Sequence, residues 1–321
     1  MNDMFTNKAG DVCITPRIVV YQTRDILKWF YMKCCMIGGD IPVITFAHHK
    51  GGTGKTTSCL NIAGYLQKAG KRVLVIDIDP QANATSGLGV DPAWLSHSMY
   101  DVFMSRIDRS AGVSIREIIR ETRSGIDLAP SSLDLVGAEP FFYNIPDRSH
   151  LLKHLISNLP GYQFVLIDTP PSMGQFVING LVASDRTVIT FDQGIFALAG
   201  LKTLMAIFDD VREYLGDTIH AEMAIVTRVG QEGGAVPGGG FLKVLKRILG
   251  IQTGTGDARA EQIFLEVEEE MKKYFQTVYT VPFNHQIAAA QRRGLPISHY
   301  DPTCDAALAY ERITQEVMTW E

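Results

Sequence analysis

The sequence predicts an α/β fold, in which a mostly parallel, twisted sheet carries helices on both of its faces. Two observations predict this fold class: short, uniformly apolar runs recur along the chain, and stretches of helical character separate them. Strands that are buried on both faces are uniformly apolar, because neither face meets water. Strands that alternate with helices favour a parallel sheet, and such sheets bind their ligands beyond the carboxyl ends of the strands.

The expected elements alternate in this way from residue 42 onwards. Residues 41–321 therefore form a single expected domain. A glycine-rich stretch at 230–256 interrupts the alternation, and we expect an inserted surface loop with a short amphipathic helix there. The expected strands are 43–47, 73–78, 164–167, 187–191, 223–227 and 278–281, and the expected helices are 56–69, 177–183, 198–214 and 260–275.

The first 40 residues lack this pattern. They hold three of the five cysteines and one short apolar run that has no partner. We expect residues 1–40 to form an N-terminal arm that is disordered, or to lie for the most part upstream of a translation start at Met36.

Composition and charge indicate a globular protein of the cytoplasm. Apolar residues make up 46% of the 321 residues, charged residues make up 20%, and the net charge is -5. An acidic total argues against a chain that mainly coats nucleic acid. The five cysteines include no Cys-x-x-Cys pair, which argues against a disulfide framework and against a zinc or iron–sulfur site. No apolar window in the sequence is long enough to span a membrane.

One segment, Lys-Gly-Gly-Thr-Gly-Lys-Thr-Thr, is typical of a phosphate-binding loop. It follows an expected strand and opens an expected helix, so its backbone N–H groups and the positive end of the helix dipole can meet phosphate oxygens together. The pattern assigns Lys55 to the β- and γ-phosphates and the Thr56 hydroxyl to Mg²⁺. The predicted nucleotide-binding residues of the loop are Lys50, Gly51, Gly52, Thr53, Gly54, Lys55, Thr56 and Thr57.

Acidic residues end two of the expected strands beside this loop. Asp77 and Asp79 close the first of them, and Asp168 closes the second. A carboxylate at the carboxyl end of a buried strand next to a phosphate loop can hold Mg²⁺ or its water ligands. One such aspartate alone is more often a helix cap or a turn residue, but three together favour a magnesium site.

Several motifs together resemble the ParA/Soj group of partition ATPases, which are relatives of MinD. Lys50 precedes the glycine pair, as in the deviant form of the Walker A motif. The segments 73–89 (VLVIDIDPQANATSGLG) and 164–174 (FVLIDTPPSMG) also match the group, as do 128–139, 197–201 and 281–302. The resemblance covers residues 41–320 and implies a P-loop NTPase fold of the deviant Walker A type, with ATP and Mg²⁺ as ligands.

The resemblance also implies a role for each matching residue. Lys50 is the signature lysine that reaches the other subunit's γ-phosphate across an ATP-dependent homodimer, and Asp79 orients the attacking water. Because that cation is delivered only in the dimer, hydrolysis should be slow until a ParB-like partner stimulates it. The implied catalytic residues are Lys50, Lys55 and Asp79, the implied metal-binding residues are Thr56, Asp77 and Asp168, and the implied adenine contacts are Pro282 and Asn284.

Sequence-independent DNA binding is a further implication, although the residues that would carry it differ here. The group's Pro-Arg-Asn-Val-Arg is replaced by Pro-Phe-Asn-His-Gln at residues 282–286, which removes both arginines. A single surface charge is more often simply solvated. DNA binding would associate this cytoplasmic protein with the nucleoid. The candidate replacements are Arg292, Arg293, Lys272 and Lys273, together with Lys243, Lys246 and Arg247 of the insertion.

Other functions of this fold class have less support. A MinD-type membrane ATPase needs a C-terminal helix with a basic face, whereas the acidic residues of the tail 306–321 outnumber its single Arg312, so stable membrane association is not expected. An iron–sulfur carrier needs paired cysteines after the core motifs, where only Cys304 lies. An ATP-dependent ligase of similar fold is a remoter alternative. The cargo stays open between a chromosome, a plasmid and a protein assembly.

Overall fold

We describe the protein from a computed structural model. It describes residues 41–108, 112–157, 159, 161–192, 197–215, 219–229 and 271–321. These residues belong to one compact unit, Ile41–Glu321. The expected arm at 1–40, the expected insertion at 230–256 and most of the expected helix 260–275 lie outside the described residues.

Within the described ranges, eight strands form one sheet in the order β3-β4-β2-β5-β1-β6-β7-β8. All neighbouring strands are parallel except β3 and β4, which form an antiparallel pair at one edge. The mostly parallel sheet that the sequence predicted is therefore confirmed. The strands are β1 (Val43–Ala47), β2 (Val73–Asp77), β3 (Arg120–Glu121), β4 (Asp127–Ala129), β5 (Phe164–Asp168), β6 (Arg186–Asp192), β7 (Ala221–Val229) and β8 (Thr277–Pro282).

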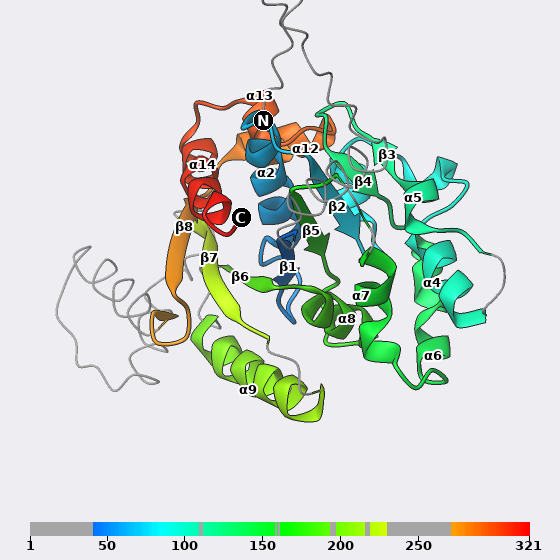
Figure 1. The fold of residues 1–321 in the computed structure, drawn as a ribbon. Coiled ribbons are helices and arrows are strands. Elements are labelled where there is room, and N and C mark those ends of the chain that lie inside the picture. Colours follow the sequence, from blue (N-terminus) through cyan, green and yellow to red (C-terminus); the bar gives the residue numbers. More distant parts are fainter. Residues whose placement is uncertain are drawn as a thin grey trace, which may run out of the picture. The chain divides into compact units, whose positions relative to one another are not determined.

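One face of the sheet is covered by α2 (Lys55–Lys68) and α14 (Asp305–Met318), together with α12 (His285–Arg292) and α13 (Ile297–Tyr300) (Figure 1). The apolar side of α14 is buried in this layer, where the fully buried Tyr310 places its hydroxyl 3.2 Å from that of Ser58 on α2. The packing explains why the C-terminal tail is amphipathic, because its apolar residues belong to the core.

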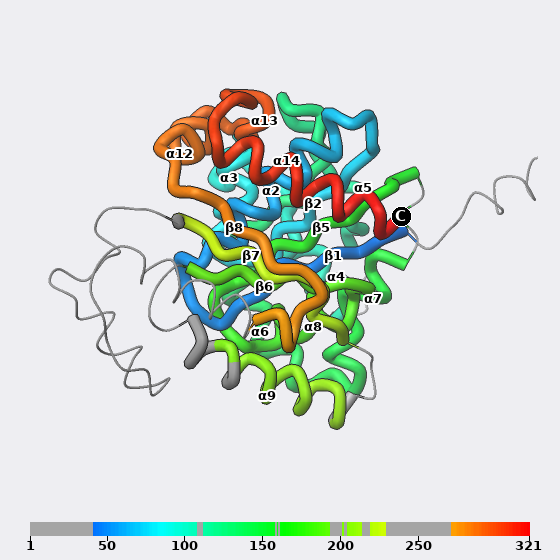
Figure 2. The backbone as a smooth tube through the Cα atoms, turned by 90° about the vertical axis from the view of Figure 1, so that its left-hand side faces the viewer, coloured from blue at the N-terminus to red at the C-terminus, as the bar shows by residue number. Residues whose placement is uncertain are grey.

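The opposite face is covered by α4 (Met99–Asp108), α7 (Leu151–Ile156), α8 (Gln175–Ala183) and α9 (Ala197–Leu215). Figure 2 shows α2 and α14 on one side of the strands and α8 and α9 on the other. Three buried rings, Phe103, Phe142 and Phe176, pack with their centroids 5.2–5.7 Å apart in this layer. Helices on both faces match the fold class that the sequence predicted.

Several short elements between β2 and β5 were not predicted from the sequence. They fill the side of the sheet beyond β2 with brief turns of helix and the β3–β4 edge. They are α3 (Asn83–Gly87), η1 (Pro92–Trp94), α5 (Ile115–Ile118), η2 (Leu133–Gly137), α6 (Glu139–Phe142) and η3 (Arg148–His150).

The sheet register brings the three strand-end aspartates to one edge. Asp77, the last residue of β2, lies directly opposite Asp168, the last residue of β5. β5 is also the parallel neighbour of β1, which leads into the loop before α2. Parallel strands that end together place the side chains that follow them in a common space, and the functional site lies there.

Candidate nucleotide-binding site

The loop between β1 and α2 has a backbone that only glycine adopts easily at two points. Gly52 and Gly54 have φ angles of +77° and +90°, in the left-handed region. A Cβ at Gly54 would also lie 2.7 Å from the Thr227 side chain at the end of β7. Both glycines are therefore required by the turn, and Gly54 is also required by the close approach of β7 to the loop.

Buried threonines fix this loop to the neighbouring strands. The hydroxyls of Thr53 and Thr190 lie 3.0 Å apart, so one donates to the other. The Thr227 hydroxyl lies 3.1 Å from the Thr53 carbonyl oxygen and 3.2 Å from that of Phe191. The side chain and the carbonyl group of Thr53 are thus both tied to the sheet, which fixes the middle of the loop to β6 and β7.

A buried histidine supports the start of the loop. His48 Nδ1 accepts a hydrogen bond from the Lys50 backbone N–H at 2.9 Å, and its ring stacks on His49 with centroids 4.5 Å apart. Burial lowers the pKa of His48 to about 3, with further contributions from His49, Lys55 and Lys50. A neutral ring that accepts at Nδ1 carries its proton on Nε2, so this tautomer is the one that the loop needs.

Lys55, the lysine of the phosphate loop, is 6% exposed at the first turn of α2. Its Nζ donates to the Lys50 carbonyl oxygen at 3.1 Å. Burial lowers the pKa of Lys55, whereas Asp168 and Asp79 act in the opposite direction. The ammonium group thus lies inside the pocket with acids nearby, as a cation that neutralises phosphate should.

Thr56 and Asp168 meet at the centre of the site. The Thr56 hydroxyl donates to Asp168 Oδ2 at 2.7 Å. The other carboxylate oxygen, Oδ1, is buried and has no hydrogen-bond partner among the described residues. Burial first, and then the charge of Asp77, raises the pKa of Asp168 well above its usual value. A buried carboxylate oxygen without a partner, beside a hydroxyl, suits a hard cation such as Mg²⁺.

The two aspartates near the end of β2 have different surroundings. Asp77 is fully buried, and its carboxylate accepts from the N–H of Asp79 at 3.0 Å and from the N–H and hydroxyl of Thr85 at 2.8 and 2.7 Å. Burial raises the pKa of Asp77 to about 7, although the Thr85 bonds oppose this. Asp77 therefore shapes the turn after β2, since protein donors already engage both of its oxygens.

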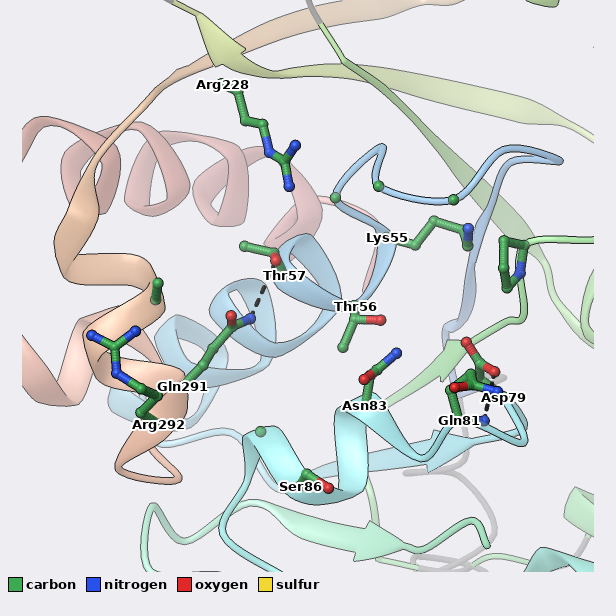
Figure 3. Close-up of a pocket in the computed structure, with 16 residues that line it drawn as sticks. Lys55, Thr56, Thr57, Asp79, Gln81, Asn83, Ser86, Arg228, Gln291 and Arg292 are labelled. Atoms are coloured by element: carbon green, nitrogen blue, oxygen red, sulfur yellow. Dashed lines mark hydrogen bonds between the residues drawn. The ribbon is translucent and has the colours of Figure 1, made fainter. Parts of the chain in front are cut away.

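Asp79 instead lines the pocket beside the loop. One of its oxygens accepts from the Gln81 N–H at 2.9 Å, which fixes the carboxylate at the turn (Figure 3). Burial raises the pKa of Asp79, whereas the Gln81 bond and Lys55 oppose this.

The pocket above the loop has a volume of about 740 Å³. Figure 3 shows Lys55, Thr56 and Asp79 on one side of it, with Arg228 and Arg292 on other parts of its wall. Its size and its mixture of backbone, hydroxyl and charged groups suit a nucleotide. The lining residues are Gly51, Gly52, Gly54, Lys55, Thr56, Thr57, Asp79, Gln81, Asn83, Ser86, Gly87, Pro171, Arg228, Ala288, Gln291 and Arg292.

A second, smaller pocket of about 140 Å³ adjoins the first and shares part of its wall. Pro282 and Asn284, the two expected adenine contacts, lie in it beside apolar side chains. Asn284 also caps α12, because its Oδ1 accepts from the Gln286 N–H at 2.8 Å. The shared residues are Gly54, Thr57, Arg228, Ala288 and Gln291.

Most of the expected phosphate and adenine residues line the two joined pockets, whereas Lys50, Thr53, Asp77 and Asp168 are not in either lining. The expected DNA contacts are separated from one another. Arg292 lines the larger pocket, while the Arg293 guanidinium lies 5.5 Å from the ring centroid of Tyr300. Lys272 and Lys273 precede β8, whereas both arginines follow its other end. The six residues of β8 span about 20 Å. The two pairs therefore do not form one patch.

Among the pocket residues that sequence reasoning missed are Arg228 and Gln291, which line both pockets. The Gln291 side-chain amide lies 3.2 Å from the Thr57 hydroxyl, which ties α12 to the start of α2 (Figure 3). Arg228 follows directly after the expected strand 223–227, so the rule that sites lie at the carboxyl ends of parallel strands could have found it. No comparable pattern in the sequence indicates Gln291.

Comparisons with known proteins agree with this geometry. A family model described as an AAA domain matches residues 41–221. The sporulation initiation inhibitor protein Soj of Bacillus subtilis is 33% identical over 280 residues, which cover 86% of this chain and 97% of that protein. The chromosome-partitioning ATPase Soj of Treponema pallidum is 31% identical over 278 residues, which cover 86% of this chain and 96% of that protein.

Two solved structures show the same fold. Cobyrinic acid a,c-diamide synthase from Mycobacterium smegmatis, with a bound ATP analogue and magnesium, matches with a TM-score of 0.64 and 23% identity over 87% of this chain and 95% of that one. The septum site-determining protein MinD from Pyrococcus horikoshii, in complex with Mg-ADP, matches with a TM-score of 0.60 and 20% identity over 86% of this chain and 95% of that one.

Proposed function

Because the chain belongs to the ParA/Soj family of partition ATPases, we propose that it binds ATP with Mg²⁺ in the two joined pockets and hydrolyses it to ADP and phosphate. We further propose that the bound nucleotide controls dimerisation of the protein. The observation that carries the proposed binding of ATP and Mg²⁺ is the Asp168 carboxylate: one oxygen accepts from the Thr56 hydroxyl, and the other is buried without a hydrogen-bond partner in the part of the chain that the structure describes.

Thr56 and Asp168 are the residues that would hold Mg²⁺, and the pocket wall supplies Asp79 for its water ligands. Asp77, our third expected metal residue, would act indirectly, by holding the turn that positions Asp79. When bound, Mg²⁺ neutralises charge on the phosphate oxygens. Lys55 would neutralise the β- and γ-phosphates, and Asp79 would orient the attacking water.

The base of the nucleotide would occupy the smaller pocket. Pro282 and Phe283 offer apolar surface there, and Ile287 on α12 adds more. Asn284 would contact adenine with the second N–H of its amide nitrogen, since its oxygen caps α12 and the nitrogen also donates to Asp305 Oδ1 at 3.4 Å. The loop from Lys50 to Thr57 would surround the phosphates with backbone N–H groups.

Lys50 would complete the active site of a second subunit. A cation that arrives only with the other subunit stabilises transition-state charge only in the dimer. Hydrolysis by the isolated protein should therefore be slow, and a ParB-like activating partner would accelerate it by improving the placement of water and cation.

Mixing two inactive variants tests this arrangement. The Lys50→Ala variant lacks the lysine but keeps its own Asp79. The Asp79→Ala variant lacks the aspartate but keeps its own Lys50. In a mixed dimer, the Asp79→Ala subunit would supply Lys50 to the complete site of its neighbour. ATPase activity should therefore return on mixing and reach its maximum at equal amounts. If co-purification of tagged and untagged subunits shows mixed dimers and activity stays absent at every ratio, Lys50 does not act between subunits.

We also propose that the ATP-bound dimer binds DNA without sequence preference, and so associates with the nucleoid. Dimerisation doubles the number of cations on one surface, and DNA affinity rises steeply with the number of phosphates neutralised. Lys272 and Lys273 should be tested apart from Arg293, because they lie at the other end of β8. Arg292 is a poor test of DNA binding, since it lines the nucleotide pocket.

Anisotropy titrations with labelled DNA decide between the candidate surfaces. The ATP state should bind at low salt and release DNA as salt rises, and the ADP state should bind weakly. Absence of binding in the ATP state at low salt would favour a protein assembly as the surface or cargo. Stable membrane association is not proposed: none of the helices in the described ranges could span a membrane, and the apolar side of α14 is already buried.

A further inference from the structure

Arg228 is a strained residue at the carboxyl end of β7. Its φ angle is +59°, and Ala82 is the only other non-glycine residue with positive φ among those that the structure describes. A side chain longer than alanine is disfavoured in this left-handed region, and such strain persists where the surrounding structure imposes it. Backbone strain of this kind is concentrated at ligand sites, so we consider what Arg228 contacts in the pocket.

The conformation lies at an irregularity of β7, whose register against β8 shifts between Val226 and Val229, and the residue before Arg228 is held in place. Thr227 is buried, and its hydroxyl lies within hydrogen-bond distance of the carbonyl oxygens of Thr53 and Phe191. The Thr227 side chain also packs directly against Gly54. The strand therefore reaches Arg228 in a fixed direction, and the Arg228 side chain turns toward the pocket on the side of Thr57 (Figure 3).

Arg228 occupies the junction of the two pockets. It lines the large pocket, which holds Lys55 and Thr56, and it lines the small pocket, which holds Pro282. If a nucleotide places its terminal phosphates at Lys55 and its base at Pro282, its ribose and its α-phosphate lie at this junction. Thr57 and Gln291 line the same junction.

The guanidinium has no acidic partner within the described part of the chain, and it is exposed at the pocket wall. An unpaired arginine that a strained backbone holds against an anion site is suited to a phosphate oxygen, because its planar donors bind phosphate in pairs. The ribose offers only neutral hydroxyls, so the α-phosphate is the better partner.

We propose that Arg228 binds the α-phosphate of the nucleotide, as a cation separate from Lys55. This inference rests on the proposed ATP site and adds a residue that the phosphate-loop pattern does not contain. ATP and ADP share the α-phosphate, so Arg228 should contribute equally to the affinity for both. A contact with the γ-phosphate would favour ATP alone.

Calorimetric titration of the full chain with unlabelled ATP and ADP, both with Mg²⁺, tests the proposal. Arg228→Gly suits the experiment because glycine adopts φ +59° without strain, so its melting temperature should equal or exceed that of the wild type. Its dissociation constants for ATP and ADP should both rise roughly tenfold, the effect expected for one hydrogen bond to a charged group. Arg228→Lys should retain part of the affinity, and Arg312→Ala, on the exposed side of α14, is the control for loss of a surface arginine.

The outcomes separate the possible failures. Unchanged affinity in Arg228→Gly would overturn the contact while the ATP site stands. A loss confined to ATP would overturn the α-phosphate assignment. A wild-type protein that binds neither nucleotide would contradict the proposed function itself. Equal loss for ATP and ADP, with a melting temperature that does not fall, would support the proposal.

Discussion

The surroundings of His48 predict a pH dependence of stability whose size can be calculated. Its pKa is about 3 in the folded protein, against 6.5 for an unperturbed histidine. The pKa of His48 is lower in the folded protein than in the unfolded chain. The contribution of His48 to the free energy of unfolding is therefore complete above pH 6.5 and is lost as pH falls toward 3. The cause is burial in the loop, reinforced by His49 and two lysines.

At pH 5.5, a histidine with a normal pKa is protonated about ten times more often than not, which stabilises the unfolded chain by about 1.4 kcal/mol. The folded protein gains almost nothing from the same protons, because His48 stays neutral. His48→Asn removes the titrating ring and keeps an acceptor for the Lys50 N–H. The fall in unfolding free energy between pH 7.5 and pH 5.5 should therefore be smaller in this variant by about 1.4 kcal/mol.

Urea unfolding of the nucleotide-free protein at the two pH values measures this difference, because the midpoint and slope give the free energy directly. His285→Asn, which removes an exposed ring on α12, is the control and should behave as the wild type does. Equal losses of stability in the wild type and in His48→Asn would refute the reasoning, since the fold would then not keep His48 neutral.

Three further predictions concern the nucleotide site and the chain's N-terminal part. Lys55→Ala should abolish ATP binding in a calorimetric titration, because it removes the cation at the β- and γ-phosphates; unchanged affinity would place the site elsewhere. Asp168→Asn should lose the Mg²⁺ dependence of ATP binding, yet melt no lower than the wild type, because it removes a buried charge beside other acids. A lower melting temperature would show that the carboxylate stabilises the fold. Deletion of residues 1–35 should leave ATPase activity intact, and a truncated protein that fails to fold would make that segment structural.

The central strands could be predicted because burial on both faces leaves mostly apolar residues in them. The run 43–47 matches β1 at both ends, and the other expected strands differ from the observed ones by two residues or fewer at each end. The phosphate loop could be predicted because its geometry needs glycines and a lysine at fixed spacing. The elements of residues 83–156 were missed. Most of them are helical turns of three to six residues, which contain too few turns to show a period, and the ten-residue α4 was missed as well.

The functional surroundings of single residues were harder to predict. Asp77 and Asp79 are two residues apart in one motif, yet the structure buries Asp77 against Thr85 and directs Asp79 to the pocket. Only the turn after β2 separates the two, and it forms through long-range packing. Arg292 was a candidate for DNA, but the direction of α12 places it at the nucleotide pocket. Side-chain direction depends on how helices pack, which a sequence motif does not specify.

The central claim is that ATP, and not ADP, drives dimerisation through this pocket. Light scattering coupled to size-exclusion chromatography measures it most directly, with Asp79→Ala used to prevent turnover of the bound nucleotide. We predict the mass of a dimer with Mg-ATP and the mass of a monomer with Mg-ADP. The same mass in both states would contradict the account.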